Sequence, residues 1–353
     1  MKKGNQMRQK IWKLLNLFRS FNVNFCYTKI AKSMKRRDFI KTTAIVTPVL
    51  GLFPPDLSEI TRVKANGKIE KRSLGKTGEK LSIIGFGGIV VRGTTPDEAS
   101  KLVKLAIDKG INYFDVAPSY GDAEVMLGPA LEPFRKDVFL ACKTTERTKE
   151  KARAELEQSL KNLRTDHFDL YQLHAVTTLK DVETILAPGG ALEAFKEAKK
   201  EGKIRFIGFS AHSVEAAMEL MNRFDFDTIL FPVNFTTWNA GNFGPQVLAR
   251  AQEKKMGILA LKAMAKGPWP TGADRGKWKK CWYEPLGTPE DVRMGLRFTL
   301  SHPVTAAVPP GEADLFKMAL DVSDTLDPLK GDEIKQIKVK GAAGVPLFKY
   351  EGA

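Results

Sequence analysis

The sequence predicts an α/β protein with a single (β/α)8 barrel domain, the TIM-barrel architecture. Short apolar runs alternate with longer amphipathic segments from residue 68 onward, which is typical of repeated βα units around a parallel sheet. Eight such units fit into roughly 240 residues, whereas a doubly wound sheet usually has about five or six strands. The doubly wound alternative also lacks its GxGxxG fingerprint, because GFGG at residues 85–88 indicates only a tight turn.

The eight expected strands share a nearly continuous content of Val, Ile, Leu and Phe, which strands covered on both faces require. Amphipathic helices are expected between them. In residues 148–164, for example, apolar side chains recur at helical spacing, at Ala152, Leu156, Leu160 and Leu163. In chain order the expected strands are residues 82–88, 112–116, 138–143, 168–174, 204–210, 228–235, 257–264 and 305–309.

The formal net charge of +15 is concentrated near the N-terminus. Residues 1–65 carry 14 of the 56 Lys and Arg residues but only 3 of the 41 Asp and Glu residues, which leaves +4 for the rest of the chain. A body with so small an excess, and with no basic stripe interleaved with aromatic residues, argues against nucleic-acid binding.

Residues 34–65 resemble an export signal of the twin-arginine type. Arg36 and Arg37 precede an apolar stretch of roughly twelve residues, which is too short for a stable membrane span of roughly 20. We expect recognition by the twin-arginine export machinery, cleavage after Ala65 and a periplasmic location. The alternative is a basic tail or a membrane-surface helix on a cytoplasmic protein.

The other boundaries follow from this segment. Residues 1–33 are a basic extension that precedes the signal. An export signal is expected at the N-terminus, so we expect translation to start at Met34. The barrel is expected over residues 66–331. Residues 332–353 are expected to be a short tail that leaves the barrel mouth open.

The cysteines and histidines give no metal-ligand pattern. Cys26, Cys142 and Cys281 form no CxxC pair, so neither a disulfide framework nor a zinc or iron–sulfur site is expected. A metal-dependent barrel hydrolase would need clustered histidines on strand ends, where only His174 is expected. We therefore expect no metal.

Four polar residues fall at the ends of successive expected strands: Asp115 and Tyr120 within FDVAPSYGDAE, then Lys143, then His174. A barrel brings the C-terminal ends of its strands to one mouth, so these side chains are expected to meet. Each alone has a simpler interpretation, as a turn cap, a rim aromatic, a solvated lysine or a core histidine. Together, on three successive strands, they predict an active site.

On these residues the chain resembles the aldo-keto reductase family, from about residue 70 to about residue 330. The resembling stretches are LGKTGEKLSIIGFGG, FDVAPSYG, ACKT, LYQLH and GFSAHS. The resemblance implies an oxidoreductase that reduces an aldehyde or ketone, or oxidises an alcohol, with Asp115, Tyr120, Lys143 and His174 as its catalytic set.

The four residue types fit this chemistry. Hydride addition to a carbonyl leaves an alkoxide, to which Tyr120 can give a proton as general acid. Lys143 is expected to lower the tyrosine pKa toward the operating pH, with Asp115 holding the ammonium. His174 is expected to orient the carbonyl oxygen.

None of these side chains carries a hydride, so a cofactor is needed. The resemblance implies NADP(H), with NAD(H) possible. Ser210 and Asn234 are the expected carboxamide contacts, Leu261 takes the place of a stacking aromatic, and Lys262 is a candidate phosphate ligand.

The adenine end is expected after the last strand, at Gly311 and Lys317. Glu312 and Asp314 lie in the same segment. Acids there would repel a 2′-phosphate and suit a ribose hydroxyl, which favours NAD(H), while the family favours NADP(H).

Substrate contacts are expected from the long loops at the mouth. Trp238 and Trp269 are candidates for stacking on an aromatic ring or a sugar, although a long loop also needs such anchors. The alternative function is a non-catalytic nicotinamide-binding barrel that acts as a sensor or docking subunit. The intact set of four residues weighs against it, because such a module needs no lysine-tuned tyrosine.

Overall fold

The computed structural model describes residues 68–352, which belong to one compact unit. The expected N-terminal extension and export signal lie outside these residues. No helix in the described part of the chain is long and apolar enough to cross a membrane.

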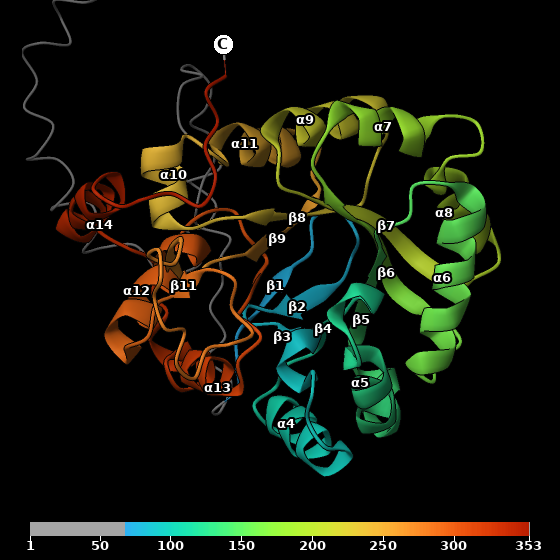
Figure 1. Ribbon diagram of the computed structural model, residues 1–353, viewed down its shortest axis with the longest axis horizontal. Helices are drawn as coiled ribbons and strands as arrows, with labels where there is room; N and C mark the ends of the chain where they lie inside the picture. The colour runs from blue at the N-terminus through green and yellow to red at the C-terminus, as the bar shows by residue number, and fades with distance from the viewer. Residues whose placement is uncertain (1–67, 353) are drawn as a thin grey trace, which may run out of the picture. The chain divides into compact units, whose positions relative to one another are not determined.

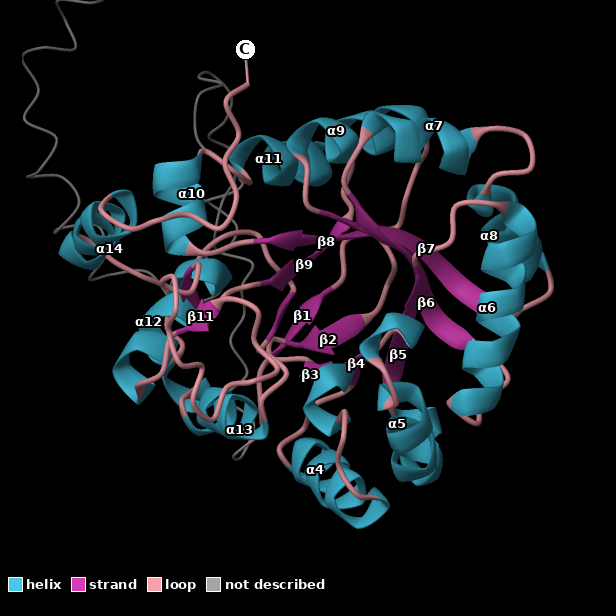
Figure 2. Ribbon diagram, in the orientation of Figure 1, coloured by secondary structure: helices cyan, strands magenta, loops and turns pink. Residues whose placement is uncertain are grey.

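Eight parallel strands form the barrel that the sequence predicts, and the helices pack around its outside (Figure 1, Figure 2). Each strand pairs with the next along the chain. The barrel closes beside its two edge strands, where Gly85 N donates to Ala307 O at 2.9 Å and Ala307 N donates to Ile83 O at 2.8 Å. The strands are β3 (Phe86–Gly87), β4 (Tyr113–Asp115), β5 (Phe139–Thr144), β6 (Phe168–Val176), β7 (Ile204–Ala211), β8 (Thr228–Pro232), β9 (Gly257–Leu261) and β12 (Ala306–Val308).

The prediction of one strand over residues 82–88 is wrong. Ser82 ends β2 (Lys80–Ser82), which pairs antiparallel with β1 (Lys71–Ser73) in a hairpin that the sequence analysis did not anticipate. Thr305, just before β12, donates its hydroxyl to Ser73 O at 2.9 Å. The hairpin therefore covers the N-terminal end of the barrel, opposite the strand ends that carry the predicted site.

The other seven strands lie where they were expected, with ends shifted by up to three residues. Two of the shifts have a clear local cause. Asn234 accepts a hydrogen bond from Thr237 N and caps a helix, so the strand before it ends at Pro232. Lys262 has a positive φ of 69°, which turns the chain directly after β9.

Helices follow the strands as predicted, and the pattern at residues 148–164 corresponds to α6. Of the five α-helices in residues 68–352 whose N-cap side chain accepts a hydrogen bond, four are capped by a hydroxyl, such as Thr95, which accepts from Glu98 N at 3.3 Å in a capping box. The helices are α4 (Pro96–Asp108), α5 (Ala123–Leu131), α6 (Lys149–Asn162), α7 (Leu179–Leu186), α8 (Ala191–Lys200), α9 (Val214–Arg223), α10 (Phe235–Gly241), α11 (Pro245–Glu253), α12 (Pro289–Leu300), α13 (Ala313–Asp321) and α14 (Asp332–Ala342).

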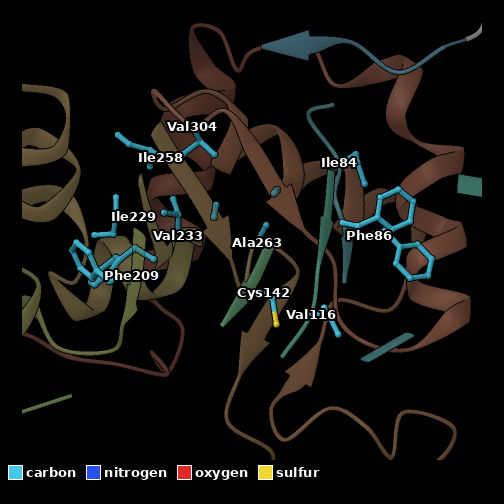
Figure 3. Close-up of a cluster of buried hydrophobic side chains, with 14 of the residues drawn as sticks. Ile84, Phe86, Val116, Cys142, Phe209, Ile229, Val233, Ile258, Ala263 and Val304 are labelled. Atoms are coloured by element: carbon cyan, nitrogen blue, oxygen red, sulfur yellow. The ribbon is translucent and has the colours of Figure 1, made fainter. Parts of the chain in front are cut away.

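The core has two layers, because alternate strand residues point outward to the helices and inward to the barrel axis. The outward layer is shown in part in Figure 3, where Val116, Cys142, Phe209 and Ile258 are among the labelled side chains. The inward layer is a separate cluster of Leu74, Leu81, Tyr113, Phe139, Ala141, Leu170, Leu230, Leu259 and Ala306. The hairpin thus contributes two leucines to the floor of the barrel.

The same alternation carries polar residues to the mouth. On β5 the inward positions run from Phe139 through Ala141 to Lys143, so the chain passes from apolar to charged along one strand. On β4 they run from Tyr113 to Asp115. The upper end of the barrel is therefore polar above an apolar floor.

The C-terminal segment does not leave the mouth open as expected. Helix α14 packs beside α10, and the chain after it runs along α10 (Figure 1), where Tyr350 N donates to Gly241 O at 2.8 Å. The ring of Phe348 lies 5.2 Å from that of His212 and 6.1 Å from that of Trp282. The segment therefore reaches the rim of the barrel.

Replacing Leu74 with alanine should destabilise the fold by about 2–5 kcal/mol, because Leu74 is fully buried in the barrel floor and its loss leaves a cavity. Urea unfolding followed by tryptophan fluorescence measures the change. Leu179→Ala is the matched control, since Leu179 is 54% exposed. Equal effects of the two substitutions would contradict a packed floor.

Candidate active site

The segment between Asp115 and Tyr120 has a conformation that its sequence explains. β4 ends at Asp115, and Pro118 begins a one-turn 3-10 helix that ends at Tyr120. Proline suits a first helical position because its missing N–H would have no partner there. Gly121 follows at φ 69°, a conformation that glycine adopts without strain, and ends the turn.

Lys143 is the central charge of the site. Its side chain is completely buried, and its ammonium forms an ion pair with Asp115. Nζ also donates to Val116 O at 3.2 Å and to the Tyr120 hydroxyl at 3.3 Å. One buried cation therefore links the carboxylate and the phenol that follow β4.

Two further side chains hold Asp115, and sequence reasoning missed both. The Tyr113 hydroxyl donates to Oδ2 at 3.1 Å, and Gln172 Nε2 donates to the same oxygen at 3.2 Å. Strand alternation was the available signal, because Gln172 lies two residues before His174 and Tyr113 two residues before Asp115. Each pair shares the inward face of its strand.

Burial and neighbouring charges have opposite effects on the pKa values of Tyr120 and Lys143. Burial is the largest influence on the pKa of Tyr120, and together with the Asp115 carboxylate it outweighs the lowering by Lys143, so the net shift is upward from 10. The expectation of a lowered tyrosine pKa is wrong, because the desolvation of the phenolate outweighs the neighbouring cation. Burial lowers the pKa of Lys143, but Asp115 and Tyr120 together outweigh it and leave the lysine pKa raised.

A β-bulge aims His174. The register of β6 against β7 shifts between Leu173 and Val176, and Ala175 has φ 52°. Ser210 stabilises the bulge, since its hydroxyl accepts from Ala175 N at 2.8 Å. The ring of His174 lies 5.6 Å from that of Tyr120 in an edge-on arrangement.

Burial keeps this histidine neutral. It lowers the pKa of His174 to about 2, and the Lys143 charge adds to the effect. Nδ1 lies 3.3 Å from the Ser119 hydroxyl, which can donate to it. With that bond the ring proton sits on Nε2.

A cavity of about 100 Å³ lies against these residues. Of the residues that the sequence predicted, Asp115, Tyr120, Leu261, Lys262 and Gly311 line it. Four further lining residues come from the loop after β9, Lys280, Cys281, Trp282 and Tyr283, none of which was a predicted site residue. The aromatic content of that loop was the available signal.

The expected nicotinamide contacts, Ser210 and Asn234, do not line the described cavity and are partly occupied. Ser210 holds the bulge and Asn234 caps α10, which leaves Asn234 Nδ2 buried without a partner. Gln172 Oε1 is also buried without a partner, next to Asp115. A buried donor and a buried acceptor of this kind fit an amide, and Lys262 and Lys280 on the cavity wall fit phosphates, so the residues present suit a nicotinamide dinucleotide.

The acids expected at the adenine end are engaged by the loop after β9. Glu312 accepts a hydrogen bond from Lys280 N, and Asp314 lies 3.8 Å from Lys277 Nζ. Lys317 lies exposed on α13. Two loop lysines that sequence reasoning did not consider therefore approach this end.

The two predicted substrate tryptophans are not among the residues that line the described cavity. Trp238 packs against Phe298 and His302 of the α12 region, with ring centroids 6.2 and 4.2 Å away. Trp269 donates Nε1 to Cys281 O at 3.0 Å and ties the loop to itself. Both contacts are those of structural anchors.

Within residues 68–352, no group of three or more His, Cys, Asp or Glu side chains is placed to hold a metal ion. Cys142 and Cys281 are buried free thiols. Cys142 donates to Glu124 at 3.4 Å on the outer side of β5, away from the cavity.

The fold and this site define a barrel enzyme whose reactive groups project from the C-terminal strand ends. The profile of the Aldo/keto reductase family matches residues 83–280. The chain belongs to this family, whose members are NAD(P)-dependent oxidoreductases and typically use NADP(H).

Similar proteins support the same assignment. The chain is 28% identical over 216 residues to the L-galactose dehydrogenase of Arabidopsis thaliana, and 32% identical over 218 residues to the aldo-keto reductase YhdN of Bacillus subtilis. The matches span 57% and 56% of this chain, and 67% and 63% of those proteins. Among solved structures, the holo form of aldo-keto reductase AKR11C1 from Bacillus halodurans superposes with a TM-score of 0.63 at 26% identity, covering 80% of this chain and 98% of that one.

His174→Gln should weaken the pH dependence of stability. Native His174 stays neutral with a pKa of about 2, so between pH 7 and pH 5 the unfolded chain binds the extra proton. The wild type should therefore lose about 2 kcal/mol through this residue as the pH falls over that range, given an unfolded pKa of about 6.5.

Urea unfolding at the two pH values measures this loss. Ser119→Ala keeps the histidine and removes only its hydroxyl neighbour, so it should retain the wild-type pH dependence. A His174→Gln protein with the wild-type pH dependence of stability would contradict a histidine that stays neutral in the folded protein.

Proposed function

We propose that this protein reduces an aldehyde or ketone to an alcohol, or catalyses the reverse reaction, with Tyr120 as general acid and base. The observation that carries the proposal is the buried ammonium of Lys143, which contacts Asp115 and the Tyr120 hydroxyl together. Such a network is costly to bury and has a chemical use only if the tyrosine exchanges a proton.

Tyr120 is the proton donor in the direction of reduction. Its raised pKa keeps the phenol protonated at neutral pH, so Oη can give its proton to the oxygen of the reduced carbonyl. The phenolate that forms is then stabilised by Lys143 Nζ, 3.3 Å away. In the reverse direction the same phenolate accepts the proton of the alcohol.

His174 positions the substrate oxygen. A neutral imidazole whose Nδ1 accepts from Ser119 carries its proton on Nε2, which can donate a hydrogen bond to the carbonyl. Because the ring does not titrate near neutral pH, this donor is present throughout the working range.

The cofactor we propose is NADP(H), with NAD(H) possible. When bound, its nicotinamide supplies or accepts the hydride. Gln172 and Asn234 would hold the carboxamide through their free amide atoms, and Leu261 would lie against the ring. Lys277 Nζ lies 3.8 Å from Asp314, and the backbone N–H of Lys280 donates to Glu312, so both contacts would reduce the repulsion that a 2′-phosphate would meet there.

Tyr120→Phe should lower turnover of carbonyl substrates by about 10²- to 10⁴-fold while leaving cofactor affinity unchanged, because only the acidic proton is removed. Residues 66–353 are titrated with NADPH and NADH by fluorescence, and absorbance loss is then followed with aldehydes, quinones and keto-sugars. Tyr350→Phe, in the segment after α14, is the control and should keep wild-type activity. Tight cofactor binding without turnover of any carbonyl would instead favour a sensor or docking barrel.

We also propose that the protein is exported through the twin-arginine machinery to the periplasm and carries its cofactor with it. Replacing Arg36 and Arg37 together with lysine should retain the protein in the cytoplasm, because the paired guanidinium groups are what the machinery would recognise. Cell fractionation and N-terminal sequencing measure the location and the cleavage after Ala65. Arg62→Lys is the control, and equal export of both variants would contradict the signal.

A further inference from the structure

The bulge in β6 is an irregular stretch of backbone between two regular ones. β5 pairs with β6 as far as Leu173, and the pairing of β6 with β7 resumes at Val176. His174 and Ala175 lie in the gap, and Ala175 has φ 52°, a left-handed conformation that costs energy for residues other than glycine. Such a conformation persists only where the surrounding structure holds it.

Arg147 bonds the carbonyl groups of the bulge. Its Nη2 donates to His174 O at 2.8 Å and to Ala175 O at 3.4 Å. Ser210 bonds the amide side, since its hydroxyl accepts from Ala175 N at 2.8 Å. The two side chains approach from the two neighbours of β6, because Arg147 follows β5 and Ser210 lies on β7. The backbone that carries His174 is therefore held from both sides.

The guanidinium of Arg147 is also anchored away from the bulge. Its Nε donates to Asp181 Oδ1 at 3.3 Å in an ion pair. Asp181 is fixed in turn by the capping box of α7, where its Oδ2 accepts from Thr178 N at 3.3 Å and its N–H donates to the Thr178 hydroxyl at 3.0 Å. The arginine side chain is only 17% exposed, so water competes little for these contacts.

The main chain at Arg147 is fixed as well. Ala191 N donates to Arg147 O at 2.8 Å, and Lys149 N donates to Gly189 O at 2.8 Å, which ties the loop after β5 to the segment before α8. Nη1 is buried without a partner among residues 68–352, so the contact with the bulge depends on Nη2 and the anchoring on Nε. Arg147 is thus held at its backbone and at its guanidinium.

The bulge determines where the ring of His174 lies. The carbonyl that accepts the shorter bond from Arg147 belongs to His174 itself, whose ring lies 5.6 Å from that of Tyr120. Its Nδ1 lies 3.3 Å from the Ser119 hydroxyl. After burial, nearby charges that include Arg147 keep the pKa of His174 low. A shift of this backbone by about 1 Å would misalign the ring, and misplacements of that size can cost about 10²-fold in rate.

We propose that Arg147 is a positioning residue for catalysis, which fixes the β6 bulge so that His174 presents Nε2 to the substrate carbonyl. Arg147 is not among the residues that line the described cavity, so it acts through His174. This inference deepens the proposed reductase function and rests on it. An arginine with a purely structural role would instead stabilise the fold without controlling one catalytic side chain.

The first test is Arg147→Met, which removes the guanidinium and keeps a long side chain. It should lower kcat by about 10- to 100-fold and change KM by less than about twofold, because the misaligned donor is lost mainly in the transition state. NADPH affinity should stay unchanged. Arg153→Met is the matched control, since Arg153 is an ion-paired arginine on α6 that does not line the described cavity, and it should keep wild-type kinetics.

The same substitution in a His174→Gln background separates positioning from a structural role. If Arg147 acts through His174, adding Arg147→Met to His174→Gln should lower kcat by less than about a further twofold. A further loss of about tenfold or more would overturn the proposal, because Arg147 would then act on the fold or on another catalytic group. Wild-type kcat in Arg147→Met alone would overturn it as well.

Arg147→Lys is the conservative variant. It keeps the positive charge, but a single ammonium does not reproduce the two-edged contacts of a guanidinium with Asp181 and the bulge carbonyls. It should therefore have a kcat between those of the wild type and Arg147→Met. If Arg147→Met does not fold, Arg147→Lys is combined with His174→Gln, and the same non-additivity is expected.

Nuclear magnetic resonance of the histidine rings gives a readout that needs no turnover. The chain has four histidines, so comparison with His174→Gln identifies the His174 signals. Long-range proton–nitrogen spectra should show the wild-type ring with its proton on Nε2, whereas Arg147→Met should show averaged tautomers, because Nδ1 no longer meets the Ser119 hydroxyl. Arg153→Met should keep the wild-type signals.

The two readouts fail separately. Wild-type histidine signals in Arg147→Met would overturn the positioning role. A wild type that turns over no carbonyl, with the difference between the wild-type and Arg147→Met spectra intact, would overturn the reductase function and leave the control of the His174 ring by Arg147.

Discussion

The buried charge of Lys143 is the constraint on which the rest of the site depends. An ammonium with no solvent exposure needs a carboxylate, and Asp115 on the neighbouring strand is the partner that barrel pairing places beside it. Asp115 in turn needs donors for its second oxygen, which Tyr113 and Gln172 supply. The ion pair thus accounts for the polar residues on three adjacent strands, and Tyr120 is attached to it through its hydroxyl.

The barrel makes this arrangement stable because it separates the apolar core from the buried charges along its axis. The floor is packed with leucines and aromatic rings, to which the β1–β2 hairpin adds Leu74 and Leu81. The ends of the strands, where side chains face the mouth, are free to carry charge. One break in regularity, the bulge in β6, turns His174 toward Tyr120 and is held by Ser210. Ser210, which was expected to contact the cofactor, therefore also shapes the catalytic geometry.

The mouth is built from segments that follow the regular units. The loop after β9 brings Trp282, Tyr283 and Lys280 to the cavity, and the segment after α14 reaches its rim through Phe348. Together they create an aromatic wall beside Lys262. Family membership defines the class of reaction, whereas these later segments form the wall of the cavity around the strand ends.

The sequence by itself determined the eight-stranded barrel and the four polar strand ends, because strand periodicity and chain order are local properties that a closed barrel converts into proximity. Tertiary structure decided the contacts between residues far apart in the sequence, which local patterns do not encode. Gln172 reaches Asp115 across 57 positions of sequence, and Trp238 packs against Phe298 of α12. The direction of the Tyr120 pKa shift was also beyond the sequence, since it depends on how far folding desolvates the phenol and on the nearby Asp115 carboxylate, which together outweigh the cation at 3.3 Å.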